Sequence, residues 1–275
     1  MRKRGVASVL AVLVPAVFLL SGCPWNDDDD ASVAVAPRQG HVLDDNTVAL
    51  WRLDESAASD NAVDATGSYG LVPFGNPDAV SGQIGNGRLL NGSSKYFQRA
   101  GDANLGVVFN GDWTYEGWVY LDPAFGNPGM LFIYNGLAFS FNQPDTILAE
   151  VQVNPDRKIV TTQWHSPTTA TDVISNTVLQ TGQFFHVAVS RTAQGGNLFT
   201  YRIYVNGVLD NTTSDVPGLS SPVTGDTHFI GLGCYTDIAG FGVGSAVLNG
   251  RLDDVRISKV ARSNAEILQS YQRGR

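Results

Sequence analysis

Positive charge is scarce in this sequence. Lys and Arg total 18 against 26 Asp and Glu, which gives a formal net charge of −8, and charged residues make up only 16% of the chain. Because nucleic acids and anionic polymers are bound by basic surfaces, this balance argues against either of them as a partner. A local basic patch is the one arrangement that such an average would miss.

The motifs of several enzyme classes are also missing. The chain has 30 glycines but contains neither a Gly-x-Ser-x-Gly elbow nor a phosphate-binding loop. His41, His165, His186 and His228 are far apart and lack the spacing of metal ligands, so zinc is not expected. His186 lies in an apolar segment, which favours a core or rim histidine over a catalytic one.

The apolar run at the N-terminus, of roughly 16 residues after three basic ones, is marginal for a membrane span. It predicts a secretory signal peptide over residues 1–22. The run ends in Leu20-Ser21-Gly22-Cys23, which resembles the lipobox of bacterial lipoproteins. The resemblance implies cleavage before Cys23 and acylation of its thiol, each buried methylene adding about 0.8 kcal/mol to membrane binding. An ordinary signal peptide with an unmodified cysteine is the alternative.

An acidic segment follows the lipobox. Asp27 to Asp30 repel one another, so residues 23–46 are expected to be an extended tether. Lipoproteins of the inner membrane often carry Asp after the acylated cysteine, and Pro24 in that place favours the outer membrane. We therefore expect an exported protein anchored to the bacterial cell envelope. With Cys23 acylated, Cys234 has no disulfide partner and is either a buried small hydrophobe or an exposed thiol.

Short alternating segments, rich in β-branched and aromatic residues and separated by turn residues, fill residues 47–271. In the first, Ala49, Trp51 and Leu53 share one face. Strands are expected at 48–53, 88–97 (in two pieces), 113–121, 131–134, 137–141, 146–153, 184–191, 199–205 and 208–212. Asn206-Gly207 predicts a type I′ hairpin turn.

Helical periodicity is clear only near the C-terminus. Ser263 and Glu266 have the spacing of a capping box, which predicts a short helix there. Because no helix alternates with the strands, a parallel α/β sheet is excluded. The predicted fold is all-β: an antiparallel β-sandwich of two sheets, as in a jelly roll, with one short C-terminal helix.

Five sequence blocks, in order, resemble the laminin G-like, concanavalin A-like jelly-roll family. They are 48–55 with 64–67, 85–92, 113–119, 185–191 with 204–208, and 248–257 with 263–267. Together they extend over nearly the whole of residues 47–271. The resemblance implies a jelly-roll domain that binds carbohydrate or another protein, although the same fold also hosts glycosidases and lyases.

Catalysis is not expected. Retaining glucanases of this architecture carry a Glu-x-Asp-x-x-Glu strand, which places two carboxylates on one face. Here Glu116 and Glu150 are each the only carboxylate of their strand. The sequence therefore favours an envelope binding module without catalysis. The alternatives are an envelope scaffold lipoprotein with a protein partner and a polysaccharide-degrading enzyme of the same fold.

The resemblance also implies one structural calcium ion near the sheet rim. The matching positions are Asp64 and Asp253, with Glu55 nearby, and such oxygen ligands suit calcium. The alternative is that these carboxylates cap turns or pair with Arg251 or Arg256.

A carbohydrate site needs aromatic faces together with amide and carboxylate groups. The residues expected to form it lie in or beside predicted loops: Tyr134, Asn135, Trp164, Tyr235 and Asp237. The alternative is that Trp164 and Tyr235 only cover loop backbone.

Overall fold

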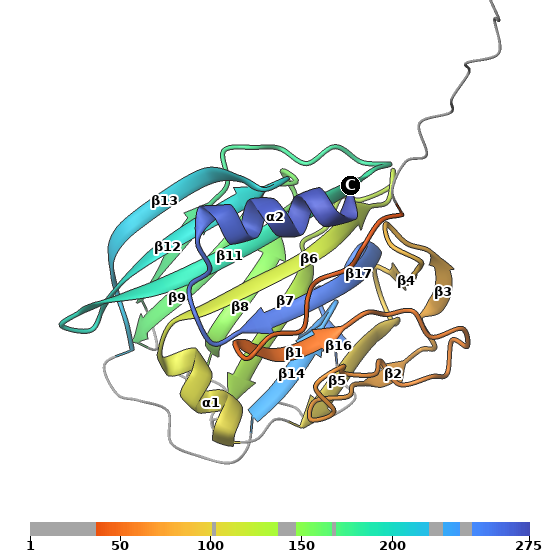
Figure 1. The fold of residues 1–275 in the computed structure, drawn as a ribbon, viewed down its shortest axis with the longest axis horizontal. Coiled ribbons are helices and arrows are strands. Elements are labelled where there is room, and N and C mark those ends of the chain that lie inside the picture. Colours follow the sequence, from red (N-terminus) through yellow and green to blue (C-terminus); the bar gives the residue numbers. More distant parts are fainter. Residues whose placement is uncertain (1–36, 101–102, 137–146, 167–168, 220–227, 237–243) are drawn as a thin grey trace, which may run out of the picture. The chain divides into compact units, whose positions relative to one another are not determined.

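The computed structural model describes residues 37–275 except 101–102, 137–146, 167–168, 220–227 and 237–243. Residues 38–275 form one compact unit, in which two antiparallel sheets pack face to face (Figure 1). This is the predicted β-sandwich. Among the described residues, no helix combines the length and the apolar content needed to cross a bilayer.

One sheet has eight strands. They are β1 (Thr47–Trp51), β3 (Asp78–Ser81), β4 (Asn86–Asn91), β6 (Trp113–Leu121), β11 (Phe184–Gly195), β12 (Leu198–Val205), β13 (Val208–Pro217) and β17 (Asn249–Ser258). Their order is β13-β12-β11-β6-β17-β4-β3, and β1 pairs with β17. Because β6 lies between β11 and β17 and is covered on both faces, eight of its nine residues are buried.

The second sheet has seven strands. They are β2 (Val72–Phe74), β5 (Tyr96–Ala100), β7 (Gly129–Gly136), β8 (Ile147–Val153), β9 (Ile159–Ser166), β10 (Thr169–Ile174) and β14 (His228–Leu232). Their order is β10-β9-β8-β7-β14-β5-β2. Two further short strands, β15 (Tyr235–Thr236) and β16 (Gly244–Ser245), pair with each other.

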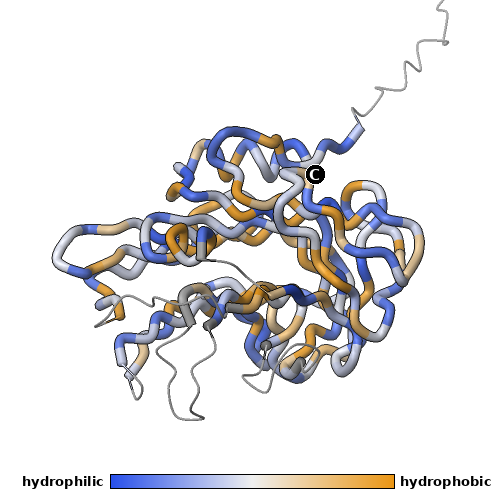
Figure 2. The backbone as a smooth tube through the Cα atoms, turned by 90° about the horizontal axis from the view of Figure 1, so that it is seen from below, coloured by the Kyte–Doolittle hydropathy of each residue, from blue (hydrophilic) through white to orange (hydrophobic). Residues whose placement is uncertain are grey.

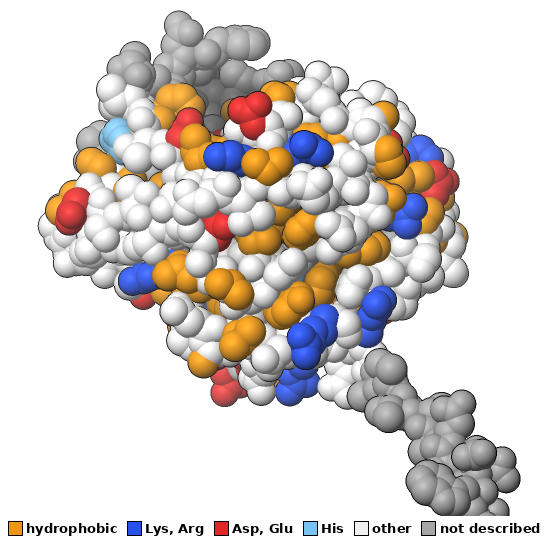
Figure 3. Space-filling model, turned by 90° about the horizontal axis from the view of Figure 1, so that it is seen from above, with side chains coloured by type: hydrophobic (Ala, Val, Ile, Leu, Met, Phe, Trp, Pro, Cys, Tyr) orange, Lys and Arg blue, Asp and Glu red, His pale blue; other side chains and the backbone are white. Residues whose placement is uncertain are grey.

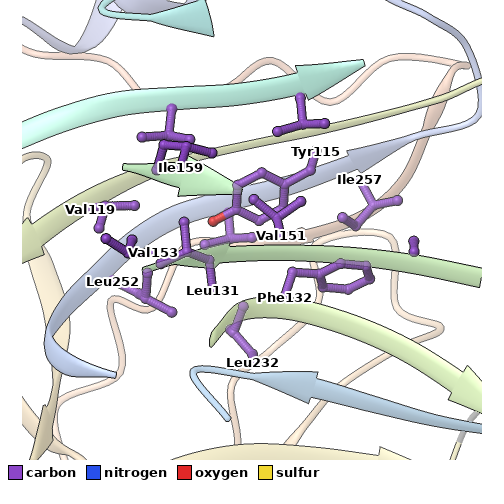
Figure 4. Packing of buried hydrophobic residues seen from close by; sticks show 14 of the residues in the cluster. Tyr115, Val119, Leu131, Phe132, Val151, Val153, Ile159, Leu232, Leu252 and Ile257 are labelled. Carbon is purple, nitrogen blue, oxygen red and sulfur yellow. The ribbon is translucent and has the colours of Figure 1, made fainter. Parts of the chain in front are cut away.

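The core lies between the two sheets and follows the period of two that strands impose. Ala49, Trp51 and Leu53 all belong to it, which confirms the predicted face of the first strand. In Figure 4, Tyr115 of β6 packs near Val151 of β8, and both are fully buried. Figure 2 shows the same two layers from another direction.

The predicted C-terminal helix is α2 (Asn264–Gly274), and both hydrogen bonds of its capping box are present. It lies on the outer face of the eight-stranded sheet (Figure 1). Ile267 packs there with Ala188 and Tyr204. The helix therefore covers Ala188 and Tyr204, which would otherwise be exposed to water.

A second helix, α1 (Ala103–Asn110), was not predicted. Its sequence contains a glycine and two valines, which favour helix weakly. Leu105 and Phe109 are buried in the main core, so tertiary packing rather than local preference stabilises this helix. Strands β2, β3, β9, β10, β14, β15 and β16 were also missed, and the predicted strand 137–141 lies outside the described residues.

The compact unit begins earlier than the predicted boundary at residue 47. The amide of Gln39 donates to the carbonyl of Arg273 at 2.8 Å, and His41 is only 3% exposed. Residues 38–46 are thus part of the folded unit rather than of the tether. Polar contacts to distant residues hold this segment, and local sequence patterns do not reveal such contacts.

Candidate functional site

The two outer faces of the sandwich differ in what covers them. On the eight-stranded sheet, Trp118 and His186 lie under α2 and contact Tyr271. Neither described helix lies on the outer face of the seven-stranded sheet, because α1 contributes Leu105 and Phe109 to the core between the sheets. We therefore take the outer face of the seven-stranded sheet as the candidate site.

Polar side chains form a row across this face. Ala149 and Val151 of β8 point into the core, so Glu150 and Gln152 point outward. Gln152 Nε2 donates to Glu150 Oε1 at 2.8 Å. On the two neighbouring strands, the hydroxyl of Thr162 donates to Asp172 Oδ1, also at 2.8 Å. These four residues, Glu150, Gln152, Thr162 and Asp172, are called the polar row below.

Glu150 has an unusual proton affinity. It is only 6% exposed, and burial raises the pKa of its carboxyl to about 7. The charge of Asp172 raises it further, while hydrogen bonds from Thr162 and Gln152 act in the opposite direction. At neutral pH the carboxyl is therefore present in both protonation states, and it can donate or accept a hydrogen bond.

Aromatic side chains lie next to the polar row. Trp164 is two residues beyond Thr162 on β9 and thus on the same face. Trp164 and Tyr235, both partly buried, pack against Met130 and Ile133. The indole Nε1 of Trp164 is buried without a hydrogen-bond partner. We call Trp164 and Tyr235, with the two aliphatic residues beneath them, the aromatic patch.

The residues predicted to bind a ligand have different positions in the structure. Trp164 and Tyr235 are brought together in the aromatic patch. Asn135 is buried on β7, and alternation places it on the same face as Ile133. Tyr134 points into the core, where its ring centroid is 4.8 Å from that of Phe109, so it is unavailable to a ligand on the surface. Asp237 lies outside the described residues.

Sequence reasoning missed the polar row. Glu150 is the only carboxylate of its own strand, and its partners are on other strands: Thr162 on β9 and Asp172 on β10. The alternation of aliphatic and polar residues along 149–153 was a usable signal that Glu150 and Gln152 face outward. The pairing of β9 with β10, which places Thr162 opposite Asp172, could not be read from the sequence.

A recess of about 150 Å³ lies at the end of the sandwich, lined by Phe109, Gln163, Arg191 and Phe199 among others. Three of its polar side chains, Arg191, Gln163 and Asn197, are already hydrogen-bonded within the protein. Arg191 donates to Gln163 and to the carbonyls of Phe109 and Gly111. Since few hydrogen-bonding groups remain for a ligand, this recess is a weaker candidate than the outer face of the seven-stranded sheet.

The residues predicted to bind calcium are not brought together. Both oxygens of Glu55 are used, one by Arg88 and one by the amide of Val63. Asp64 accepts hydrogen bonds from the backbone amides of its own loop, as a turn cap does. Asp253 accepts from the amide of Ile84 and keeps one buried oxygen without a partner. These three side chains do not fit a shared calcium site.

Across the described parts of the chain, one group of three side chains has the spacing of metal ligands: His41, Glu116 and His186. All three side chains are buried. Glu116 and His186 are on the outer face of the eight-stranded sheet, because Tyr115 and Val187 beside them point into the core. Burial lowers the pKa of His186 to about 3, so this ring is neutral. The spacing of the histidines in the sequence did not predict this group.

Comparison with known families gives one clear match. The sequence model described as the concanavalin A-like lectin/glucanases superfamily, of the Laminin_G_3 type, matches residues 90–268. This is about two thirds of the chain. A search of curated proteins found no match.

Several solved structures share the fold. Domain 4 of AbnA, a GH43 extracellular arabinanase from Geobacillus stearothermophilus in complex with arabinotriose, has a TM-score of 0.57 at 19% identity; the match covers 82% of this chain and 98% of that one. The receptor-binding domain of a botulinum neurotoxin C/D mosaic serotype has a TM-score of 0.58 at 16% identity, and the match covers 84% of this chain and 52% of the toxin domain. A Trypanosoma rangeli sialidase has a TM-score of 0.56 at 15% identity, and the match covers 87% of this chain and 35% of the sialidase. This chain thus spans about half of the toxin domain, and at these identities the likeness concerns the fold.

Proposed function

Because this chain belongs to the concanavalin A-like lectin/glucanases superfamily, we propose that it is a carbohydrate-binding module. The ligand would lie on the outer face of the seven-stranded sheet. The observation that carries the proposal is the aromatic patch beside the polar row. An indole face packs against the C–H groups of a sugar ring, while carboxylate and amide groups bond its hydroxyls.

A neutral glycan suits this surface best. Glu150 and Asp172 would repel an acidic sugar placed on the polar row, and the net charge of −8 acts in the same direction. On the side of the molecule seen in Figure 3, charged side chains of both signs are scattered among uncharged ones. The arabinanase domain in complex with arabinotriose supports the same class of ligand.

We further propose that the module is exported and anchored to the bacterial outer membrane through acyl chains on Cys23. The supporting observation is the lipobox-like sequence that ends at this residue, followed by an acidic segment. Acyl chains hold a protein at the membrane without a spanning helix. A glycan of the envelope or the surroundings would then be bound close to the membrane.

The test uses the full-length chain, purified in detergent. It is passed over a panel of immobilised neutral and acidic polysaccharides, and both retention and released sugars are measured. Retention on a neutral polysaccharide without released products is the expected result. Absence of retention on every glycan would contradict the proposal and favour a protein partner in the envelope, to be sought by cross-linking.

A second candidate, glycoside hydrolysis, is favoured by one observation. Glu150, with its raised pKa, shares a face with Asp172, and glycosidases use a protonated and an ionised carboxyl in combination. New reducing ends in the same assay, abolished by Glu150→Gln, would establish this activity. A binding module would release none.

A further inference from the structure

We propose that His41, His186 and Glu116 bind one divalent transition-metal ion, with Zn²⁺ the best fit. His41 Nε2 lies 3.4 Å from His186 Nε2 and 3.7 Å from Glu116 Oε1, and His186 Nε2 lies 3.9 Å from the same oxygen. The point equidistant from these three atoms is about 2.1 Å from each. Zinc bonds to histidine nitrogen and carboxylate oxygen are about 2.0–2.2 Å long.

One of the three atoms, Glu116 Oε1, has no hydrogen-bond partner within the protein, and the two Nε2 atoms have only each other at 3.4 Å. Glu116 Oε1 is fully buried, and no donor lies within hydrogen-bonding distance of it. A buried carboxylate oxygen without a partner is costly, because it has lost its water. The gaps of 3.7 and 3.9 Å are too long for hydrogen bonds but suit a metal between the groups.

The residues around the three ligands are arranged as in metal sites. Asp254 Oδ2 lies 2.6 Å from His41 Nδ1, which places the proton on Nδ1 and leaves Nε2 free to ligate. Such a carboxylate–histidine pair orients the ring of a metal ligand. The second oxygen of Glu116 is held by Arg256, which fixes the carboxylate with Oε1 toward the histidines.

Charge and access also fit a cation. Four carboxylates (Asp44, Glu116, Asp254, Glu266) and three guanidinium groups (Arg52, Arg256, Arg262) make up the connected ion pairs, which leaves one negative charge in excess. A recess of about 190 Å³ beside them is lined by two of these carboxylates and by three arginines: Asp44, Glu266, Arg256, Arg262 and Arg273. This recess is the proposed entry route.

The ligands come from three separate segments: the residues before β1, strand β6 and strand β11. A bound metal would therefore join the segment that follows the tether to the centre of the eight-stranded sheet. Three protein ligands leave one of zinc's usual four positions open. Because all three ligands are buried, we expect the metal to stabilise the fold and not to act on a substrate. This inference does not depend on the proposed carbohydrate site, which lies on the other sheet.

The test uses the full-length chain in detergent, stripped with a chelator and then titrated with Zn²⁺ or Co²⁺. We expect one metal ion per chain, a higher melting temperature with zinc, and the intense visible absorption of Co²⁺ in a site of low coordination number. His41→Ala should abolish all three effects. His165→Ala is the matched control, because His165 bonds the carbonyl of Pro217 and the hydroxyl of Thr171. It should bind metal like the unmodified chain.

Asp254→Asn provides a second test that does not remove a ligand. The φ of Asp254 is 46°, a conformation that Asn tolerates, so the variant should fold. We expect zinc affinity to fall by about 10- to 100-fold, as for other partners of metal-bound histidines. Zinc uptake by folded His41→Ala equal to that of the unmodified chain, or no uptake by the folded unmodified chain, would overturn the proposal.

Discussion

Arg256 on β17 lies directly opposite Glu116 on β6, and its guanidinium donates through both Nε and Nη2 to one carboxylate oxygen. Neither side chain is more than 3% exposed. The pair thus joins two central strands of the eight-stranded sheet. Arg262 Nε approaches the same oxygen at 3.4 Å, so two arginines compensate one buried carboxylate.

Replacing Arg256 should destabilise the protein severely. Arg256→Met leaves the carboxylate of Glu116 buried with only Arg262 nearby, and breaking a buried pair in this way costs about 3–5 kcal/mol. The free energy of unfolding in urea measures the effect. Arg202→Met is the control, because Arg202 is half-buried and donates only to Thr192; it should cost about 1 kcal/mol or less. Equal effects of the two substitutions would contradict the prediction.

The aromatic patch should carry glycan affinity. Trp164→Ala and Tyr235→Ala each remove a ring, and we expect a loss of about tenfold or more in affinity, equivalent to about 1.4 kcal/mol. Affinity electrophoresis on the retained polysaccharide measures it. Tyr120→Ala is the control. It removes a partly buried ring of the eight-stranded sheet, which packs against Phe184 of the same sheet, and it should leave glycan affinity unchanged. Undiminished binding by both patch variants would place the ligand elsewhere.

Asp253 should make stability depend on pH. Burial raises the pKa of this carboxyl from 3.8 to about 8, and the charges of Asp254 and Asp54 add to the shift. The folded protein therefore holds this proton more tightly than the unfolded chain. The stability that the folded protein gains from this tighter proton binding is fully present below about pH 4 and is lost as the pH rises to about 8.

Asp253→Asn keeps a carbonyl oxygen for the amide of Ile84 but has no charge to bury. Relative to the unmodified chain, it should therefore gain melting temperature at pH 8 and little at pH 4. Calorimetry with a chelator present, so that bound cations do not contribute, measures the difference. If the melting temperatures of Asp253→Asn and the unmodified chain differ by the same amount at both pH values, Asp253 does not titrate in this range.

Cys234 should be unreactive in the folded protein. It is fully buried, and burial raises the pKa of its thiol to about 12, so almost none is present as the reactive thiolate at neutral pH. In a Cys23→Ser background, a thiol-specific reagent should label the chain only after denaturant is added. Rapid stoichiometric labelling without denaturant would contradict this burial.

Cys23→Ser should release the protein from membranes. Without acyl chains the chain has only its apolar N-terminal run, which is marginal for a span. Detergent-phase partition of cell extracts measures the change, and Cys234→Ser should still partition into detergent. If Cys23→Ser also stays in the detergent phase, the proposed anchor is wrong.

The sequence predicted the fold because strands leave a local signature. Ala49, Trp51 and Leu53 are apolar at every second position, and this period of two follows from strand geometry alone. The cap of α2 was predicted for the same reason, since Ser263 and Glu266 are only three residues apart. Helix α1 escaped prediction because Leu105 and Phe109 are held by distant core residues.

The candidate sites depended on contacts between distant segments. Glu150 seemed alone on its strand, and only the pairing of β8 with β9 and of β9 with β10 brings it near Asp172. His41 and His186 are 145 residues apart and meet because the segment before β1 packs over the eight-stranded sheet. Tyr134 was expected at the surface, but the register of β7 directs it into the core.

The sequence by itself therefore determined many of the strands, the C-terminal helix and the kind of fold, since these follow from residues a few positions apart. Only the tertiary structure decided which polar groups meet, which are buried and which face outward. The reason is physical: backbone geometry repeats locally, whereas a site is formed by strand order, register and burial, which the whole chain fixes together.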